Sequence, residues 1–143
     1  KVLRDDHAGS VKEFNPAVIN TLMDAGYVVL VSPPGYSEGG MPINFDGDKL
    51  ALGLAEAMGA EALLFFSDTP GLLADRYDES TLITRVDASN PEAALSAAAD
   101  RMVVKVEQAV KAVEAGVQQV ILADARIDAP ITAALAGKGT VIA

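Results

Sequence analysis

The densest polar chemistry in the chain lies in residues 44–48, where Asn44, Asp46 and Asp48 precede a run rich in alanine and leucine. The run, residues 49–58, is apolar on most sides, which predicts a buried helix whose first turn is held in place. The first turn of a helix presents free backbone N–H groups and the positive end of the helix dipole. These features suit a phosphoryl group, so the segment is a candidate site for phosphoryl transfer.

A simpler interpretation applies to the same residues. Asn and Asp are preferred residues at the beginning of a helix, where their side chains accept hydrogen bonds from free backbone N–H groups. Taken alone, residues 44–48 are better explained as a helix cap. A catalytic interpretation therefore needs support from other parts of the chain.

The elements that position these residues form a repeated pattern, in which a helix stopped by glycine is followed by an apolar strand. The helices end near residues 25, 58, 115 and 136, and the strands are residues 27–31, 62–66, 119–123 and 140–142. Residues 27–31 contain no polar break, as expected of a strand buried on both faces. Four such units predict the α/β class, as a three-layer sandwich with a mainly parallel sheet, helices on both faces and additional β-hairpins.

Ligands of such sheets bind beyond the carboxyl ends of the strands. The segments that follow the predicted strands are residues 32–36, 67–71 and 124–126. All three are polar, kinked or rich in glycine, as binding loops are. They are the candidate binding loops of the predicted sheet.

The chain between the second and third units also contains predicted elements. Residues 81–86 alternate like the second arm of a hairpin, and Asn90 with Pro91 could cap a short helix over residues 92–99. A long amphipathic helix then opens at Arg101, with Lys105 about one turn in. By composition Lys105 is a surface cation, but its valine neighbours require it either to extend to solvent or to meet an anion.

Composition excludes several classes of function. The chain has 143 residues and a net charge of −9, which argues against a nucleic-acid binder. It has no cysteine, which removes disulfides, thiolate zinc sites and thiol nucleophiles, and fits a reducing cytoplasm. Its apolar runs are of strand length, so no membrane span is expected.

Three further features concern single residues and the ends of the chain. His7, the one histidine, lies in a turn-rich segment of a predicted hairpin over residues 1–12 and is interpreted as a solvated turn residue. The chain begins without methionine at what looks like the middle of a strand, so we expect it to be a piece of a longer protein. Neither common glycine-rich phosphate loop is present, so any ATP site must be of another kind.

Three separated motifs resemble those of the amino acid kinase family, which includes acetylglutamate kinase, aspartokinase and carbamate kinase. Residues 44–48 are similar to its Asn-x-Asn-x-Asp motif, residues 67–72 to its Thr/Ser-Asp-Val-Pro/Ser-Gly-Leu/Ile nucleotide loop, and residues 102–105 to its Gly-Met-x-x-Lys motif. Gly139 and Thr140 also match. The resemblance covers the whole chain but only the later half of a family member. It implies that residues 1–143 are one domain, the C-terminal ATP-binding lobe, without the acceptor-binding lobe.

Two positions resemble one branch of this family. Asp46 replaces the asparagine usual in acetylglutamate kinases, and Arg101 replaces their glycine. Both look like kinases of LysW-bound aminoadipate or glutamate, enzymes of lysine and arginine biosynthesis whose substrate is carried on a small acidic protein. Residues 124–126 also resemble that branch, although Ala125 stands at its usual glycine, and Asp100 is a further departure. N-acetylglutamate kinase of arginine biosynthesis is the alternative.

The resemblance implies roles for individual residues. Asn44 is similar to the asparagine that holds the main-chain end of the acceptor, Asp48 to the aspartate that organises lysines around the phosphates, and Lys105 to the lysine that draws charge toward the leaving ADP. The implied nucleotide-binding residues are Ser67, Asp68, Pro70, Gly71, Leu72, Tyr77, Arg101, Met102 and Lys105. The implied cofactors are ATP and Mg²⁺, the ion bridging the phosphates with few dedicated protein ligands. The implied products are an acyl phosphate and ADP.

A hypothesis from another class remains beside the kinase one. The chain could be a nucleotide-binding or subunit-interface module without activity of its own. The family's glycine-rich loop and second catalytic lysine belong to the half that this chain lacks. We therefore expect the chain alone to bind ATP weakly without turnover. We also expect the full-length protein to be a cytoplasmic homo-oligomer.

Overall fold

The structure, a computed structural model, describes residue 9, residues 11–98 and residues 101–143. Most of the hairpin predicted for residues 1–12, including His7, lies outside the described residues, as does Asp100. Among the described residues, each helix is too short or too polar to cross a lipid bilayer.

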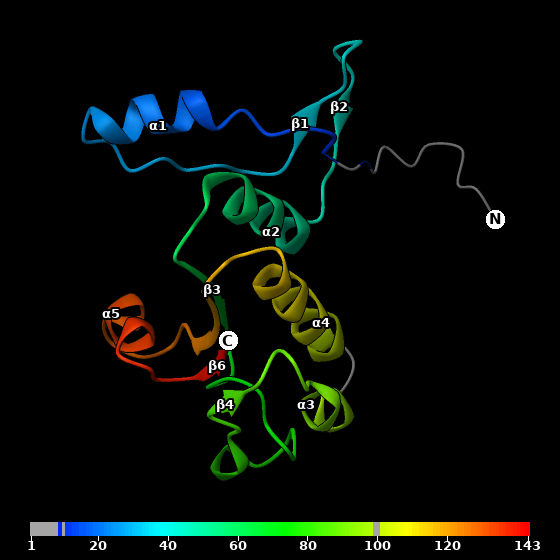
Figure 1. The fold of residues 1–143 in the computed structure, drawn as a ribbon, viewed down its shortest axis with the longest axis vertical. Helices are drawn as coiled ribbons and strands as arrows, with labels where there is room; N and C mark the ends of the chain where they lie inside the picture. The colour runs from blue at the N-terminus through cyan, green and yellow to red at the C-terminus, as the bar shows by residue number, and fades with distance from the viewer. Residues whose placement is uncertain (1–8, 10, 99–100) are drawn as a thin grey trace, which may run out of the picture.

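The described elements are five α-helices, six strands and one 3₁₀-helix, named as in Figure 1. In chain order they are α1 (Pro16–Asp24), β1 (Gly35–Tyr36), β2 (Pro42–Ile43), α2 (Gly47–Met58), β3 (Ala62–Ser67), η1 (Glu79–Thr81), β4 (Arg85–Val86), α3 (Glu92–Ala97), α4 (Arg101–Glu114), β5 (Gln119–Asp124), α5 (Pro130–Leu135) and β6 (Thr140–Ile142).

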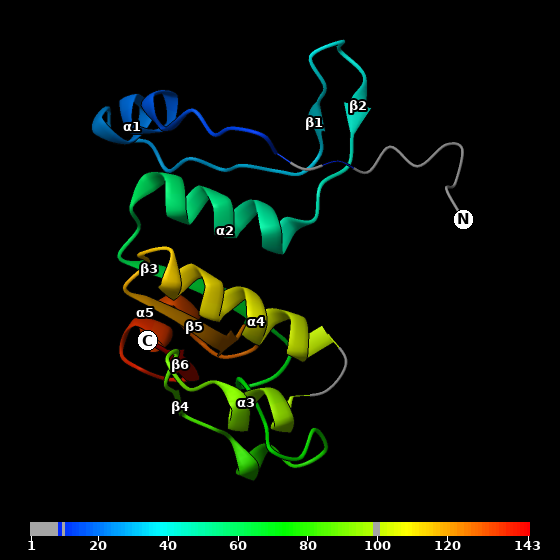
Figure 2. The same cartoon turned by 45° about the vertical axis from the view of Figure 1, so that its right-hand side comes forward.

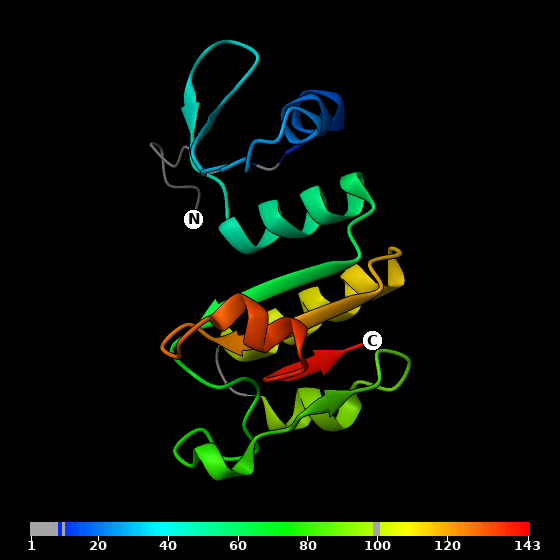
Figure 3. The same cartoon turned by 90° about the vertical axis from the view of Figure 1, so that its left-hand side faces the viewer.

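Four strands form the main sheet in the order β3-β5-β6-β4, which can be followed from top to bottom in Figure 3. β3 and β5 are parallel, and Ser67 lies opposite Asp124 at their carboxyl ends. The loops that follow these two strands therefore leave the sheet at the same edge.

The last strand, β6, was predicted to run parallel to its neighbour β5, but it runs in the opposite direction. β6 pairs antiparallel with β5, and Thr140 lies opposite Leu122. The reason is the length of α5, whose six residues extend only about 9 Å, whereas β5 spans about 20 Å. So short a helix does not return the chain to the beginning of β5. The sheet is therefore mixed, because β4 in turn pairs parallel with β6.

Helices cover both faces of the sheet, with α4 and α5 on opposite sides in Figures 1 and 2. Alternate residues of β5 contact different helices. Val120 and Leu122 belong to a core that includes Val106 of α4, whereas Ile121 belongs to a second core with Ala134 of α5. The three-layer α/β arrangement expected from the sequence is confirmed.

The helix ends follow the predicted signals in most cases. The Asn15 side chain accepts a hydrogen bond from the N–H of Ala17 at the start of α1, and Gly59 ends α2 in a left-handed conformation. The predicted cap of α3 is wrong, because Pro91 occupies the cap position and no side-chain hydrogen bond caps this helix.

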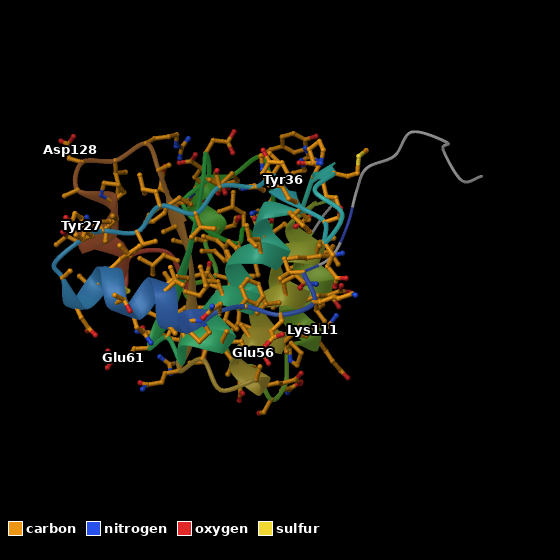
Figure 4. All side chains as sticks on the ribbon, turned by 90° about the horizontal axis from the view of Figure 1, so that it is seen from above. Tyr27, Tyr36, Glu56, Glu61, Lys111 and Asp128 are labelled. Carbon is orange, nitrogen blue, oxygen red and sulfur yellow. The ribbon has the colours of Figure 1, made fainter. Side chains whose placement is uncertain are left out.

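The apolar residues 27–31 are not the buried strand that their composition predicted. They are extended but unpaired within the described part of the chain, and Val28 and Leu30 are 89% and 92% exposed. In Figures 1 and 3, α2 lies between this segment and β3, so no strand of the described residues pairs with the segment. A strand is buried on both faces only when neighbouring elements cover it. Figure 4 shows α1 and this segment on the outside of the molecule, with Tyr27 near its periphery.

Two other features near α2 also differ from the predictions. This helix was expected to be buried, but Ala55 is its one buried residue. α2 packs mainly against α4, and fewer residues cover its other sides. The hairpin of β1 and β2 was not located, since the glycines of its turn, residues 39–40, occur in many kinds of loop. By contrast, the hairpin arm predicted in residues 81–86 is present, because Leu82 bridges Leu73 in antiparallel pairing before the chain joins the main sheet as β4.

Candidate active site

The beginning of α2 combines the two interpretations of its polar residues. Asp46 is the helix cap, and its carboxylate accepts a hydrogen bond from the N–H of Lys49 at 3.0 Å. Asp48 lies in the first turn and points elsewhere, toward α4. The capping interpretation therefore accounts for Asp46 and leaves Asp48 for another role.

Asp48 forms an ion pair with Lys105. The Lys105 Nζ atom lies 2.9 Å from Asp48 Oδ2 and 5.0 Å from the centre of the Phe65 ring on β3. The two side chains are 22% (Lys105) and 40% (Asp48) exposed. The lysine thus meets an anion from its own chain, and its ammonium group is fixed where α2, α4 and the sheet meet. An ion pair that solvent reaches contributes little to stability.

The loop after β3 is held by hydroxyl groups. Ser67 Oγ lies 3.0 Å from Thr69 Oγ1, and the N–H of Leu72 donates to Thr140 Oγ1 at 2.8 Å. Gly71 has a φ of +153°, and a Cβ atom there would approach Thr140 Oγ1 to 2.6 Å. The loop therefore requires glycine at position 71.

A pocket of about 820 Å³ lies beside this loop. It is lined by Asp68, Thr69, Gly71, Leu72, Leu73, Ala74, Asp75, Arg76, Ala97 and Met102. Four of these, Asp68, Gly71, Leu72 and Met102, are among the nucleotide-binding residues named from the sequence. A pocket of this size, with apolar walls and a few charged groups, can hold a small organic ligand.

Other residues named from the sequence do not line this pocket. Pro70 lines a neighbouring cavity of about 370 Å³, and Ser67 is occupied in the hydroxyl contacts of its loop. Tyr77 is 86% exposed, with the Arg76 guanidinium 5.1 Å from its ring centre. The side chain of Arg101 is outside the described part of the structure.

Asn44 lines a second pocket, of about 770 Å³. Its lining residues include Asp46, Lys49, Glu56 and Gln108. Asn44 itself is exposed. The amide group combines donors and an acceptor, so it can bind a polar ligand of either charge.

Along α4, Lys105 lies between a residue of one pocket and a residue of the other. Met102, Lys105 and Gln108 follow one another at three-residue spacing on α4, so they form a row along the helix. Met102 lines the pocket beside the loop after β3, and Gln108 lines the pocket of Asn44. Lys105, in the middle of the row, lines neither.

Sequence reasoning missed a cluster at the carboxyl end of β5. Arg126 donates from Nε and Nη2 to the two oxygens of Asp124, at 2.8 and 2.7 Å, and its Nη2 also lies 2.8 Å from Glu79 Oε1. The hydrogen bonds from the Arg126 side chain and then from its backbone N–H lower the pKa of Asp124 to about 2. Residues 124–126 were identified as a binding loop, but nothing in the sequence pairs them with Glu79.

Within the described residues, no group of three or more His, Asp or Glu side chains is placed to hold a metal ion.

The sequence model of the amino acid kinase family matches residues 2–124. The chain therefore belongs to the amino acid kinase family.

Comparison with individual proteins agrees with this assignment. The chain is 49% identical to a LysW-aminoadipate kinase of Deinococcus radiodurans, covering 99% of this chain and 49% of that protein. It is 35% identical to an acetylglutamate kinase of Methanopyrus kandleri, covering 95% and 54%. The structure is similar to that of N-acetylglutamate synthase from Neisseria gonorrhoeae in complex with coenzyme A and L-arginine, with a TM-score of 0.85, 27% identity, and 96% and 32% of the two chains covered. The chain spans about half the length of the curated relatives it matches.

Proposed function

We propose that this chain is the nucleotide-binding part of a kinase that transfers a phosphoryl group from MgATP to a side-chain carboxylate. The products are ADP and an acyl phosphate. The observation that carries this proposal is the position of Lys105, paired with Asp48 and placed between two pockets. Phosphoryl transfer depends mainly on positioning and on stabilisation of negative charge, and an ammonium group between two substrates provides both.

The nucleotide occupies the pocket beside the loop after β3. Met102 and Leu72 offer apolar contacts for the base, and the Asp68 carboxylate can accept hydrogen bonds from ribose hydroxyl groups. The phosphates then extend along α4 toward Lys105. Magnesium enters as part of MgATP and is held chiefly by the phosphate oxygens.

The acceptor occupies the pocket of Asn44. The amide of Asn44 binds the main-chain end of an amino acid derivative, and the side-chain carboxylate points toward Lys105. Given the higher identity to LysW-aminoadipate kinase than to acetylglutamate kinase, the proposed acceptor is aminoadipate or glutamate carried on an acidic LysW-type protein. N-acetylglutamate is the alternative acceptor.

Residues 1–143 are proposed to form the C-terminal, nucleotide-binding lobe of the kinase. Support comes from the share of the relatives that the chain covers, 49% of the Deinococcus radiodurans enzyme. The other lobe would supply the rest of the acceptor site. The complete enzyme is proposed to work in the cytoplasm, where ATP is available, as a homo-oligomer.

A non-catalytic role as a subunit-interface module is the second candidate. It is favoured by the exposed apolar side chains of Val28 and Leu30, since exposed apolar groups are common at interfaces. The two candidates differ in what they require of Lys105. A kinase lobe needs its charge for MgATP, whereas an interface module does not.

Isothermal titration of residues 1–143 with MgATP tests the proposal. We expect detectable binding that Lys105→Ala and Asp68→Ala abolish and that Lys111→Ala, a change to an exposed lysine further along α4, leaves intact. ADP production by the chain alone should stay at background with any acceptor. Equal binding by all four proteins would refute the proposed site, and robust turnover by the chain would refute the division between two lobes.

The acceptor is identified with the full-length enzyme that contains this chain. We expect phosphorylation of aminoadipate attached to its carrier protein and much slower phosphorylation of acetylglutamate. The opposite preference would support the alternative acceptor. Activity with neither, together with phosphorylation of aspartate or UMP, would move the chain to another branch of the family.

A further inference from the structure

One wall of the nucleotide pocket belongs to a segment that projects from the sheet. Asp75 and Arg76 line the pocket, and both lie between the paired residues Leu73 and Leu82. The base of the projection is well fixed, because the N–H of Ile83 donates to the carbonyl of Leu72 at 2.9 Å. Residues 75–80, by contrast, are all exposed. We refer to residues 75–81 as the tip.

The tip has a dense internal network of hydrogen bonds. The Asp75 carboxylate accepts from the N–H of Tyr77 at 3.0 Å, and the Asp78 carboxylate accepts from the N–H of Ser80 at 2.9 Å. Thr81 Oγ1 accepts from the N–H of Asp75 at 2.9 Å. These contacts give the tip its shape. The partners in these three contacts all lie within the tip, and the N–H of Ala74 donates to the carbonyl of Thr81 at 3.0 Å where the tip joins its base.

Arg126 connects the tip to the sheet. Its guanidinium group binds both oxygens of Asp124, at 2.8 and 2.7 Å, and the Asp124 side chain is only 10% exposed at the end of a central strand. The backbone N–H of Arg126 also donates to Asp124 Oδ1. This two-point contact fixes the orientation of the guanidinium group, so the Nη2 atom is directed at Glu79 of the tip, 2.8 Å away.

We propose that Arg126 is a positioning residue for the nucleotide pocket, holding the tip through Glu79 so that Asp75 and Arg76 form the pocket wall. The proposal rests on the nucleotide function proposed above. Arg126 does not line the pocket, so it acts through the tip and not by contact with the nucleotide. A lysine could not replace it, since an ammonium group lacks the planar fork that binds Asp124 and Glu79 together.

The test compares MgATP affinity in residues 1–143 and five variants. Arg126→Gln and Glu79→Gln should each weaken binding about fivefold, the upper range for an exposed charged pair. The double variant should also be about fivefold weaker, because either change releases the tip. Arg126→Lys should fail to restore affinity. Asp128→Asn, an exposed carboxylate in the same loop, is the matched control and should bind like the original chain.

A purely structural role predicts a different result. The variants would then lose thermal stability, but their MgATP affinity well below the melting temperature would stay unchanged. Multiplicative effects, about 25-fold in the double variant, would also overturn the proposal, because they mean that Arg126 and Glu79 act separately. Backbone amide NMR spectra without nucleotide provide the second readout. We expect Arg126→Gln to shift the signals of residues 75–81, and unchanged signals there would overturn the proposal as well.

The design separates this inference from the nucleotide function. Absence of MgATP binding to the original chain would refute the nucleotide function, and with it any role of Arg126 in binding. Normal binding by the original chain and equally by Arg126→Gln would refute the role of Arg126 alone.

Discussion

Lys105 Nζ lies 2.9 Å from Asp48 Oδ2, which joins two helices through residues 57 positions apart in the sequence. The contact brings together the first turn of α2, which follows Asn44 and Asp46, and the lysine of α4. It gives the proposed phosphoryl transfer a spatial basis that neither segment provides alone.

The ion pair should be coupled energetically, but weakly. In a double-mutant cycle, Asp48→Asn and Lys105→Met should show a coupling free energy of about 0.5–1 kcal/mol, because both side chains are partly exposed to solvent. Urea unfolding of the four proteins measures it. A coupling energy of zero would mean that the contact does not persist in solution.

Asp124 should titrate abnormally. Its pKa is about 2, lowered from 3.8 by hydrogen bonds from Arg126, so the folded state favours the ionised form. The resulting stabilisation is complete above about pH 4 and is lost as the pH falls toward 2. Carbon NMR of the carboxyl groups should find this low pKa in the original chain and a value near 3.8 in Arg126→Gln. An ordinary pKa in the original chain would contradict the observed contacts.

Gly71→Ala should distort the loop after β3. The added Cβ would lie 2.6 Å from Thr140 Oγ1 in a backbone conformation that side chains rarely adopt. We expect a loss of about 1–3 kcal/mol in the free energy of unfolding and weaker MgATP binding. Gly39→Ala is the control, because its Cβ would have no contact closer than 3.8 Å. Equal stability of the two variants would show that the loop tolerates a side chain at position 71.

Thr140→Val should loosen the base of the same loop. The buried Thr140 hydroxyl accepts from the N–H of Leu72 and donates to the carbonyl of Ile83. Removing it leaves two backbone groups without a partner, at a cost of about 1–3 kcal/mol. Thermal and urea unfolding should show this loss, while Thr132→Val on the exposed face of α5 changes little. A Thr140→Val chain as stable as the original would mean that water replaces the hydroxyl.

The sequence was most informative where structure depends on neighbouring residues. Asn15 and Gly59 mark helix ends because capping involves only a few adjacent positions. Burial depends on what packs against a segment, so the apolar composition of residues 27–31 led to the wrong prediction of a buried strand. The direction of β6 was wrong for a related reason, since it depends on the short length of α5 relative to β5.

The candidate site also contains some residues that the sequence predicted and others that only the structure brings together. Motifs predicted the loop after β3 and singled out Asp48 and Lys105. Arg126 and Glu79 lie 47 residues apart, and each alone resembles an ordinary surface charge. Their pairing follows from the common edge at which the loops leave the sheet, which only the three-dimensional arrangement reveals.

The most direct test of the central claim is to map MgATP onto residues 1–143 by changes in backbone amide NMR signals. We expect changes in residues 68–76 and in the first turns of α4, centred on Met102 and Lys105, with residues 27–41 unaffected. Changes confined to residues 27–41, or no change at MgATP concentrations in the millimolar range, would contradict it.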